Sequence, residues 1–226
     1  MKTILVVGGS RGIGKAIVEE LKENHIIINF SRSEGVSHPN VANHTIDATS
    51  SDLPELGDEI NGLVYCPGSI NLKPINRLSL DDFRSDFEIN VIGAVRIIQH
   101  YIKQLRNSNS SVVLFSTVAT KLGMPFHASV AASKSAVEGL TKSLAGEFAT
   151  KVRFNCIAPT VTDTSLAEKL LRNDKQKENM ENRHPLKKYL QAEEVASLAS
   201  YLLSDKSKAI SGQVFPIDAG IVSLKL

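Results

Sequence analysis

Three glycines near the start of the chain have the spacing of a phosphate-binding turn. Gly8, Gly12 and Gly14 stand between an apolar run, residues 3–7, and the first helical pattern. Glycine permits a tight turn and a close approach of the backbone to a pyrophosphate, and a helix N-terminus offers free N–H groups and a favourable dipole. The pattern therefore predicts a nucleotide site, with a glycine-rich turn that binds no ligand as the alternative.

The end of the next apolar run, residues 25–30, indicates which nucleotide to expect. Ser31 and Arg32 follow this run, and no carboxylate stands there. Proteins that bind NAD usually place an acidic residue at this point, where it accepts from the ribose 2′-hydroxyl, whereas an arginine can pair with the 2′-phosphate of NADP. We therefore expect NADP(H) to be preferred over NAD(H). An ordinary solvated surface arginine is the alternative for Arg32.

Short apolar runs alternate with longer helical stretches, and these elements must position the residues above. The strand-like runs are residues 3–7, 25–30, 41–46, 62–66, 111–116, 152–157 and 213–217. One helical pattern begins at Ile13, and three others cover residues 80–105, 128–150 and 192–203. Ser79 is the expected N-cap of the helix that begins at residue 80. The alternation predicts one doubly wound α/β domain over residues 1–226, a seven-stranded parallel sheet with helices on both faces.

Two connections depart from this alternation. Residues 31–40 are few and contain Gly35 and Pro39, which predicts an irregular crossover rather than a helix. Residues 165–190 are highly charged and follow the sixth strand. At the carboxyl end of a parallel sheet such a segment commonly covers the ligand crevice, so we expect a small substrate lid.

Composition limits the possible partners. The 226 residues are 42% hydrophobic and 22% charged, as in ordinary globular proteins. The 26 basic and 24 acidic residues give a net charge of +2 without a basic block, so neither nucleic acid nor a membrane is expected as a partner. Cys66 and Cys156 form no disulfide framework, and the apolar start is too short for a signal peptide. We expect a cytoplasmic protein.

Several motifs together resemble the short-chain dehydrogenase/reductase family, including members of the 3-oxoacyl-acyl-carrier-protein reductase type. The turn from Gly8 to Gly14 is similar to the family's T-G-A-S-R-G-I-G, Asn90 to its helix-four asparagine, and Lys134 in Ala-Ser-Lys to its lysine. The likeness covers essentially the whole chain and extends to residues 218–220, Asp-Ala-Gly. It implies a Rossmann fold and hydride transfer between NADP(H) and a small-molecule carbonyl or alcohol.

The resemblance also implies a set of cofactor-binding residues. They come from the glycine turn, the ends of the second, third and fourth strands, and the P-G-x-x-x-T segment after the sixth. These residues are Gly8, Ser10, Arg11, Gly12, Ile13, Gly14, Ser31, Arg32, Asp47, Ala48, Cys66, Pro67, Gly68, Lys134, Pro159, Thr160, Thr162 and Thr164.

The catalytic positions depart from the family at two points, and one of them removes the proton donor. Asn90 and Lys134 are retained, and Thr117 keeps a hydroxyl where the family has serine. The family's proton-donating tyrosine lies four residues before the lysine, but here that residue is Val130, which cannot donate a proton. An isolated change could be an engineered knockout, whereas several unusual positions together indicate a divergent lineage.

Two side chains are candidates for a substitute donor. His127 precedes the helix that carries Lys134 and could donate as an imidazolium, although a surface loop histidine is the alternative. Tyr65, at the end of the fourth strand, is expected to point toward the cofactor crevice, with packing against a helix as its alternative.

Two hypotheses about function follow. The first is an NADP(H)-dependent oxidoreductase with a noncanonical proton donor, and the second is a catalytically weak or silent NADP-binding protein that acts as a cofactor sensor or a partner subunit. In the family the two long helices form a bundle across a dimer axis, which predicts a homodimer or homotetramer; ordinary core packing is the alternative. The apolar residues concerned are Val91, Val95, Ile98, Ile102, Ala136, Val137, Leu140 and Leu144.

Overall fold

The computed structural model describes residues 1–225 and contains the predicted parallel sheet. Its order is β3-β2-β1-β4-β5-β6-β7, and every neighbouring pair is parallel. All seven strands agree with the predicted runs to within two residues. They are β1 (Lys2–Val7), β2 (His25–Ser31), β3 (Val41–Thr45), β4 (Gly62–Tyr65), β5 (Ser111–Phe115), β6 (Arg153–Pro159) and β7 (Val214–Ile217).

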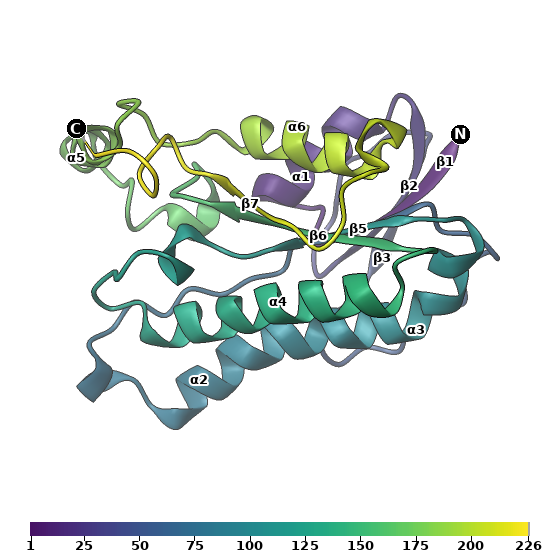
Figure 1. The fold of residues 1–226 in the computed structure, drawn as a ribbon, viewed down its shortest axis with the longest axis horizontal. Helices are drawn as coiled ribbons and strands as arrows, with labels where there is room; N and C mark the ends of the chain where they lie inside the picture. Colours follow the sequence, from purple (N-terminus) through teal and green to yellow (C-terminus); the bar gives the residue numbers. More distant parts are fainter. Residues whose placement is uncertain (226) are drawn as a thin grey trace.

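Helices cover both faces of this sheet, as expected for a doubly wound fold. They are α1 (Gly12–Leu21), α2 (Leu80–Phe87), α3 (Gly93–Asn107), α4 (Ala128–Glu147), α5 (Asp174–Arg183) and α6 (Ala192–Leu203). Helices α2, α3 and α4 lie on one face, and α1 and α6 lie together on the other (Figure 1). Each face has its own cluster of buried apolar side chains, because the strands are buried on both sides.

The predicted helix over residues 80–105 is interrupted by a π-helical segment, Glu88–Ile92, between α2 and α3. The predicted N-cap is confirmed: Ser79 and Asp82 form a reciprocal capping box at the start of α2. Asn90 lies at the centre of the π segment, and such segments are frequent at functional sites. The sequence analysis did not predict this interruption.

The connections follow the sequence only in part. The crossover between β2 and β3 has no helix, as predicted, and the β3–β4 connection, where no helical pattern was found, also lacks one. The latter is held by α3, where the Tyr101 hydroxyl donates to the Pro54 carbonyl over 2.7 Å and Arg96 donates to the Ala48 carbonyl over 3.1 Å.

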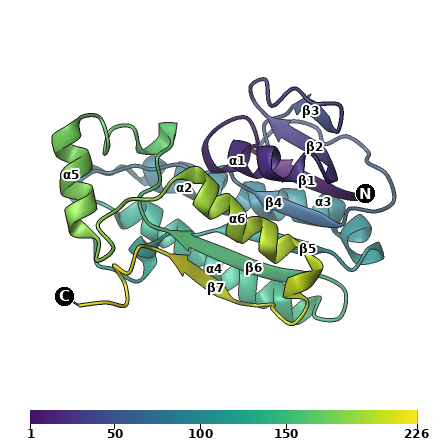
Figure 2. The same cartoon turned by 90° about the horizontal axis from the view of Figure 1, so that it is seen from above.

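The segment 165–190 is more regular than expected, because it contains α5. This helix begins at the N-cap Asn173, whose side chain accepts from the Gln176 N–H, and none of its residues is buried. A helix without an apolar stripe gives no periodic signal, so the prediction of an irregular segment was wrong here. Figure 2 shows α5 beyond the carboxyl ends of β6 and β7, on the side where a lid would lie.

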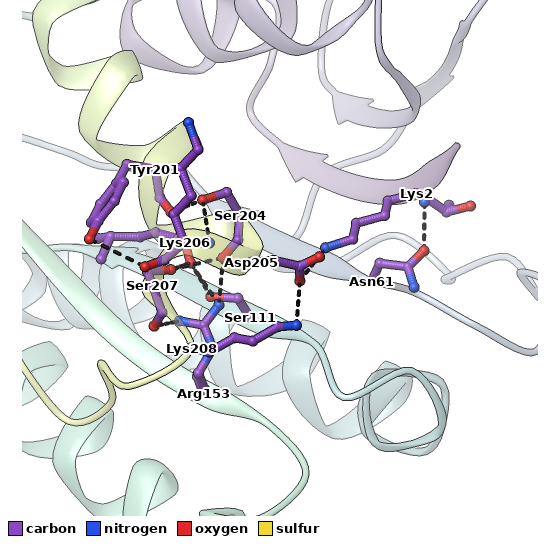
Figure 3. A network of polar contacts seen from close by, with 12 residues as sticks. Lys2, Asn61, Ser111, Arg153, Tyr201, Ser204, Asp205, Lys206, Ser207 and Lys208 are labelled. Carbon is purple, nitrogen blue, oxygen red and sulfur yellow. Dashed lines mark hydrogen bonds and ion pairs between the residues drawn. The ribbon is translucent and has the colours of Figure 1, made fainter.

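A closed polar network occupies the opposite, amino end of the sheet (Figure 3). Arg153, at the start of β6, donates to four carbonyls in and after α6, those of Leu202, Ser204, Ser207 and Ile210. The Ser111 hydroxyl adds a bond to the Leu202 carbonyl, and Lys2 pairs with Asp205 over 2.7 Å. The network satisfies carbonyls at the end of α6 that have no partner within the helix.

Helices long and apolar enough to span a bilayer are not found among residues 1–225.

Candidate active site

The glycine turn between β1 and α1 has the geometry that its sequence demands. Gly8 and Gly12 have φ values of +85° and +50°, a backbone region that favours glycine. At Gly14 a Cβ atom would lie 2.2 Å from the Gly8 carbonyl oxygen, so any side chain there would clash with the backbone of the turn. The N-cap residue Arg11 makes no side-chain cap hydrogen bond, and the first turn of α1 holds no acidic residue. This turn can therefore receive a phosphate group.

A buried asparagine that the sequence analysis missed holds this turn in place. The Asn29 Oδ1 atom accepts from the Gly9 N–H over 3.0 Å and from the Ser31 hydroxyl over 2.9 Å. Its Nδ2 donates to Asn43 on β3 over 2.7 Å. A polar residue inside an otherwise apolar strand was the available signal, because a fully buried amide requires partners.

At the end of β2, the Arg32 side chain is exposed, whereas the Ser31 side chain is buried. Ser31 is buried, and its hydroxyl bonds within the protein, so its side chain does not face a cofactor as the prediction assumed. Arg32 and Arg11 are exposed, and within residues 1–225 neither forms an ion pair. The Ser33 hydroxyl donates to Ser10 over 3.1 Å and ties this strand end to the glycine turn.

Asp47 follows β3 and is already engaged locally. Its Oδ1 accepts from the N–H and the hydroxyl of Thr49, and these hydrogen bonds lower the pKa of the carboxyl group. Ala48 is buried beside it. The other carboxylate oxygen of Asp47, Oδ2, makes none of these bonds and can accept from an adenine amino group.

The structure corrects the prediction for Tyr65, the candidate proton donor at the end of β4. Tyr65 is buried, its hydroxyl donates to the Ile89 carbonyl of the π segment over 2.7 Å, and it does not line the cavity described below. Burial also raises its pKa well above the ordinary value. The expectation that Tyr65 points into the crevice was wrong, because the π segment leaves a carbonyl that needs this donor.

Asn90 and Lys134 are brought together as the sequence predicted. Both pack against Gly68, where an added Cβ would lie 3.4 Å from the Asn90 Oδ1 and 3.5 Å from the Lys134 Nζ. Lys134 is buried and donates to the Phe115 carbonyl over 2.9 Å, and burial lowers its pKa to about 8. A lysine of this kind can give up a proton near neutral pH.

One cavity of about 160 Å³ joins these residues to the glycine turn. Thr117, His127, Val130 and Lys134 line it, whereas Asn90, the fifth predicted catalytic residue, lies behind its wall. The His127 Nδ1 faces the Pro125 carbonyl at 2.7 Å and must carry a hydrogen to bond it. The neutral ring then leaves Nε2 as an acceptor, so His127 could donate a proton only as the imidazolium.

The cavity is also lined by Ile13, Cys66, Gly68 and the predicted residues of the β6 loop, Pro159, Thr160, Thr162 and Thr164. Thr164 reaches the glycine turn, since a Cβ on Gly12 would lie 3.1 Å from its methyl group. Burial raises the pKa of the Cys66 thiol to about 12, so this cysteine is no nucleophile.

Thr160 is tied to the lid by a residue that the sequence analysis missed. The buried His184, which follows α5, contacts the Thr160 hydroxyl through Nε2 at 2.8 Å and the Met180 carbonyl through Nδ1 at 2.7 Å. The two partners are 24 residues apart, and no local pattern connects them.

Comparison with known proteins identifies the family. A family model described as enoyl-(acyl carrier protein) reductase matches residues 34–222. A tropinone reductase homologue from Arabidopsis thaliana is 31% identical, with 97% of this chain and 91% of that protein covered. The 3-oxoacyl-[acyl-carrier-protein] reductase of Rickettsia felis is also 31% identical, over 98% and 97%. This chain is a short-chain dehydrogenase/reductase.

Solved structures agree with this assignment. A short-chain dehydrogenase family protein from Francisella tularensis superimposes with a TM-score of 0.90 at 28% identity, covering 99% of this chain and all of the other. A 4-hydroxyisoleucine dehydrogenase solved with NADH has a TM-score of 0.89 at 25% identity, over the full length of both chains. The predicted Rossmann fold and single domain are confirmed, and the chain belongs to a family of oxidoreductases.

Within residues 1–225, no group of three or more His, Cys, Asp or Glu side chains is placed to hold a metal ion.

Proposed function

We propose that this protein is an NADP(H)-dependent oxidoreductase that interconverts a small-molecule carbonyl compound and its alcohol, with a proton donor other than tyrosine. The observation that carries the proposal is the single cavity in which Thr117, Val130 and Lys134 meet Ile13 of the glycine turn. When bound, the nicotinamide cofactor supplies or accepts the hydride. Lys134 holds the nicotinamide ribose, and the Thr117 hydroxyl orients the carbonyl.

The preference for NADP(H) rests on charge at the end of β2. Arg32 and Arg11 are exposed and free of carboxylate partners among the described residues, so both guanidinium groups can bond a 2′-phosphate. The NADH found in the 4-hydroxyisoleucine dehydrogenase supports a nicotinamide cofactor as such. The absence of an acidic residue at Ser31 or Arg32 favours the phosphorylated form.

The substrate half of the cavity favours an aliphatic compound with an anionic group. Its walls include apolar side chains from several elements. Among residues 1–225, Lys134 and Arg183 are the only Lys or Arg residues in the lining, and no Asp or Glu lines it. Arg183 ends α5, and its side chain forms no ion pair within the described residues. We propose that the lid, residues 165–190, closes over the substrate through this arginine, which should slow its amide hydrogen exchange when NADP(H) and substrate bind.

Oligomeric state is a separate proposal. Of the eight apolar residues on the two long helices, Ile98 and Val137 lie in the core, and Val91, Ile102, Leu140 and Leu144 pack against it. Val95 and Ala136 are left for contact with a second copy, as the proposed homodimer or homotetramer requires. Sedimentation velocity would test this, and a monomer at micromolar concentration would refute it.

The decisive experiment compares binding with turnover. Calorimetry should give a much smaller Kd for NADPH than for NADH, and Arg32→Ala should erase most of the difference, while the control Arg106→Ala on α3 should leave it unchanged. NADPH oxidation is then followed with aliphatic 2-oxo acids, their methyl esters and 4-nitrobenzaldehyde. Tight NADPH binding without turnover would favour a cofactor-sensing protein, and equal Kd values would overturn the proposed NADP(H) preference.

A further inference from the structure

A buried carboxyl group lies directly behind the cavity, and the mechanism above does not use it. Asp86 is on α2 with no exposed surface, and within residues 1–225 it forms no ion pair. Burying a carboxyl group is costly unless its oxygens are bonded. Its Oδ1 accepts from the Ser69 hydroxyl over 2.5 Å and from the Asn71 amide over 2.9 Å, whereas its Oδ2 has no partner. This side chain is therefore held in place but not fully satisfied.

Ser69 connects the carboxyl group to the reaction site. It is partly exposed, lines the same cavity as Val130 and Lys134, and follows Gly68, which packs against Lys134 Nζ and Asn90 Oδ1. Asn90 donates to the Ser69 hydroxyl over 3.2 Å. One hydroxyl group thus faces the substrate space on one side and a buried carboxyl group on the other.

Asn90 contacts both Ser69 and Asp86 and fixes their relative position. Its Nδ2 also donates to the Asp86 carbonyl over 2.8 Å and to the Ser133 hydroxyl over 3.2 Å, and its own Oδ1 is buried without a partner. Asp86 and Asn90 are about one helical turn apart, so both side chains reach Ser69 in the loop after β4. Two buried oxygens without partners among residues 1–225 thus lie beside one hydroxyl group, although most buried polar atoms in proteins are paired.

We propose that Ser69 and Asp86 form the proton-transfer pair that replaces the missing tyrosine. This inference rests on the proposed oxidoreductase function. In reduction, the carbonyl carbon accepts a hydride from the reduced nicotinamide, the carbonyl π bond breaks, and the oxygen takes the Ser69 hydroxyl proton. As the Ser69 hydroxyl turns from Asp86 Oδ1 to the substrate oxygen and gives up its proton, the Ser69 oxygen takes the proton of the Asp86 carboxyl group. After the alcohol leaves, solvent returns a proton to the buried carboxylate through the partly exposed Ser69. In oxidation every transfer runs in reverse, and the Asp86 carboxylate receives the alcohol proton through Ser69.

Single-turnover kinetics test the pair against His127. With saturating NADPH and 4-nitrobenzaldehyde, Asp86→Asn and Ser69→Ala should each slow hydride transfer by about 10²-fold, the usual contribution of a general acid. The double variant should be no slower than the slower single variant, because the two residues act as one unit. The control Asp81→Asn, an exposed acid on the same helix, should change the rate less than threefold. A loss of about 10²-fold in His127→Ala with no loss in Asp86→Asn would assign the donor to His127 and overturn the pair. Rates for Asp86→Asn within threefold of the wild type, or additive losses in the double variant, would overturn the pair.

A second measurement does not depend on turnover. Infrared spectra of the cofactor-free protein, with Asp86→Asn subtracted, should show a carboxyl band whose intensity changes with pH, since a relay group must bind and release a proton. Absence of any pH-dependent band would overturn the pair even in an active enzyme. A pH-dependent Asp86 band without turnover of any carbonyl would instead contradict the proposed function. NADPH affinity should be the same in all these variants, which shows that each remains folded.

Discussion

The two ends of the parallel sheet differ in how their ionisable side chains are paired. At the amino end, the Arg153 guanidinium donates to four carbonyls and closes the network shown in Figure 3. At the carboxyl end, Asp86 Oδ2 is buried without a partner among residues 1–225, and Lys134 is buried with a single carbonyl as its hydrogen-bond partner. Neutral groups do not follow this division, because buried atoms without partners include Asn90 Oδ1 at the carboxyl end and the Ser110 hydroxyl at the amino end.

The difference shows where the fold is stabilised and where it is prepared for chemistry. A satisfied network lowers the energy of the native state, whereas unpartnered groups in a cavity cost stability and are available to a ligand. Parallel strands direct all their carboxyl ends to one side, so ligand-binding loops gather there, and the amino end is left to close the structure. Substitutions at the two ends should therefore separate activity from stability.

The largest effect is expected from restoring a phenol at the carboxyl end. Val130→Tyr places a tyrosine one helical turn before Lys134 on the cavity wall, and it should raise carbonyl reduction by about 10²-fold. The ring enters a packed site, so stability should fall by about 1–3 kcal/mol. Val130→Phe is the matched control, because it adds the ring without the hydroxyl group. Equal rates for the two variants, measured as NADPH oxidation, would contradict the assignment of this position.

At the amino end, Arg153→Met should cost stability and leave catalysis intact. The substitution removes all four hydrogen bonds to the end of α6 and leaves carbonyls unpaired, which should lower the free energy of unfolding by about 2–4 kcal/mol. Urea titration measures the loss, and NADPH affinity per folded molecule should stay within twofold. A loss below about 1 kcal/mol would show that this network is dispensable.

Lys134 should make the carboxyl end sensitive to pH in a defined direction. Its pKa is lowered by burial from 10.5 to about 8, so between these values the unfolded chain holds a proton that the native protein has released. Stability therefore rises with pH across this window, and the wild type should gain about 2 kcal/mol relative to Lys134→Met from pH 8 to pH 10. Urea unfolding of both proteins at each pH gives the difference between their free energies of unfolding. Cysteine and tyrosine side chains titrate in both proteins, so their contributions cancel in this difference. A difference independent of pH would mean that Lys134 is not desolvated.

The smallest effect is expected from the exposed part of the amino-end network. Lys2→Ala removes the ion pair with Asp205. The Lys2 side chain is 38% exposed and the Asp205 side chain 64%, and a pair this accessible contributes less than about 1 kcal/mol to stability. The small loss should disappear in 1 M salt, where charges are screened. A loss comparable with that of Arg153→Met, by the same urea titration, would mean that the network acts as one unit.

The sequence predicted the elements and the residues of the site that depend on local pattern. Apolar runs located all seven strands, the glycine spacing located the tight turn between β1 and α1, and Ser79 located the start of α2. Each is a property of neighbouring residues, since strand burial, turn conformation and capping are decided within a few positions. The resemblance to the family implied Thr117, Val130 and Lys134 as catalytic positions, and all three line one cavity.

Only the tertiary structure decided how the loops converge at the carboxyl end of the sheet. Ser69 meets Asp86, His184 meets Thr160, and Tyr65 turns to the π segment instead of the crevice. The polar helix α5 was also invisible, because it buries nothing. Local sequence determines which residues form an element, but the partner of a buried polar group depends on which loops the sheet order brings together, and residues 17 to 24 positions apart carry no periodic signal of that meeting.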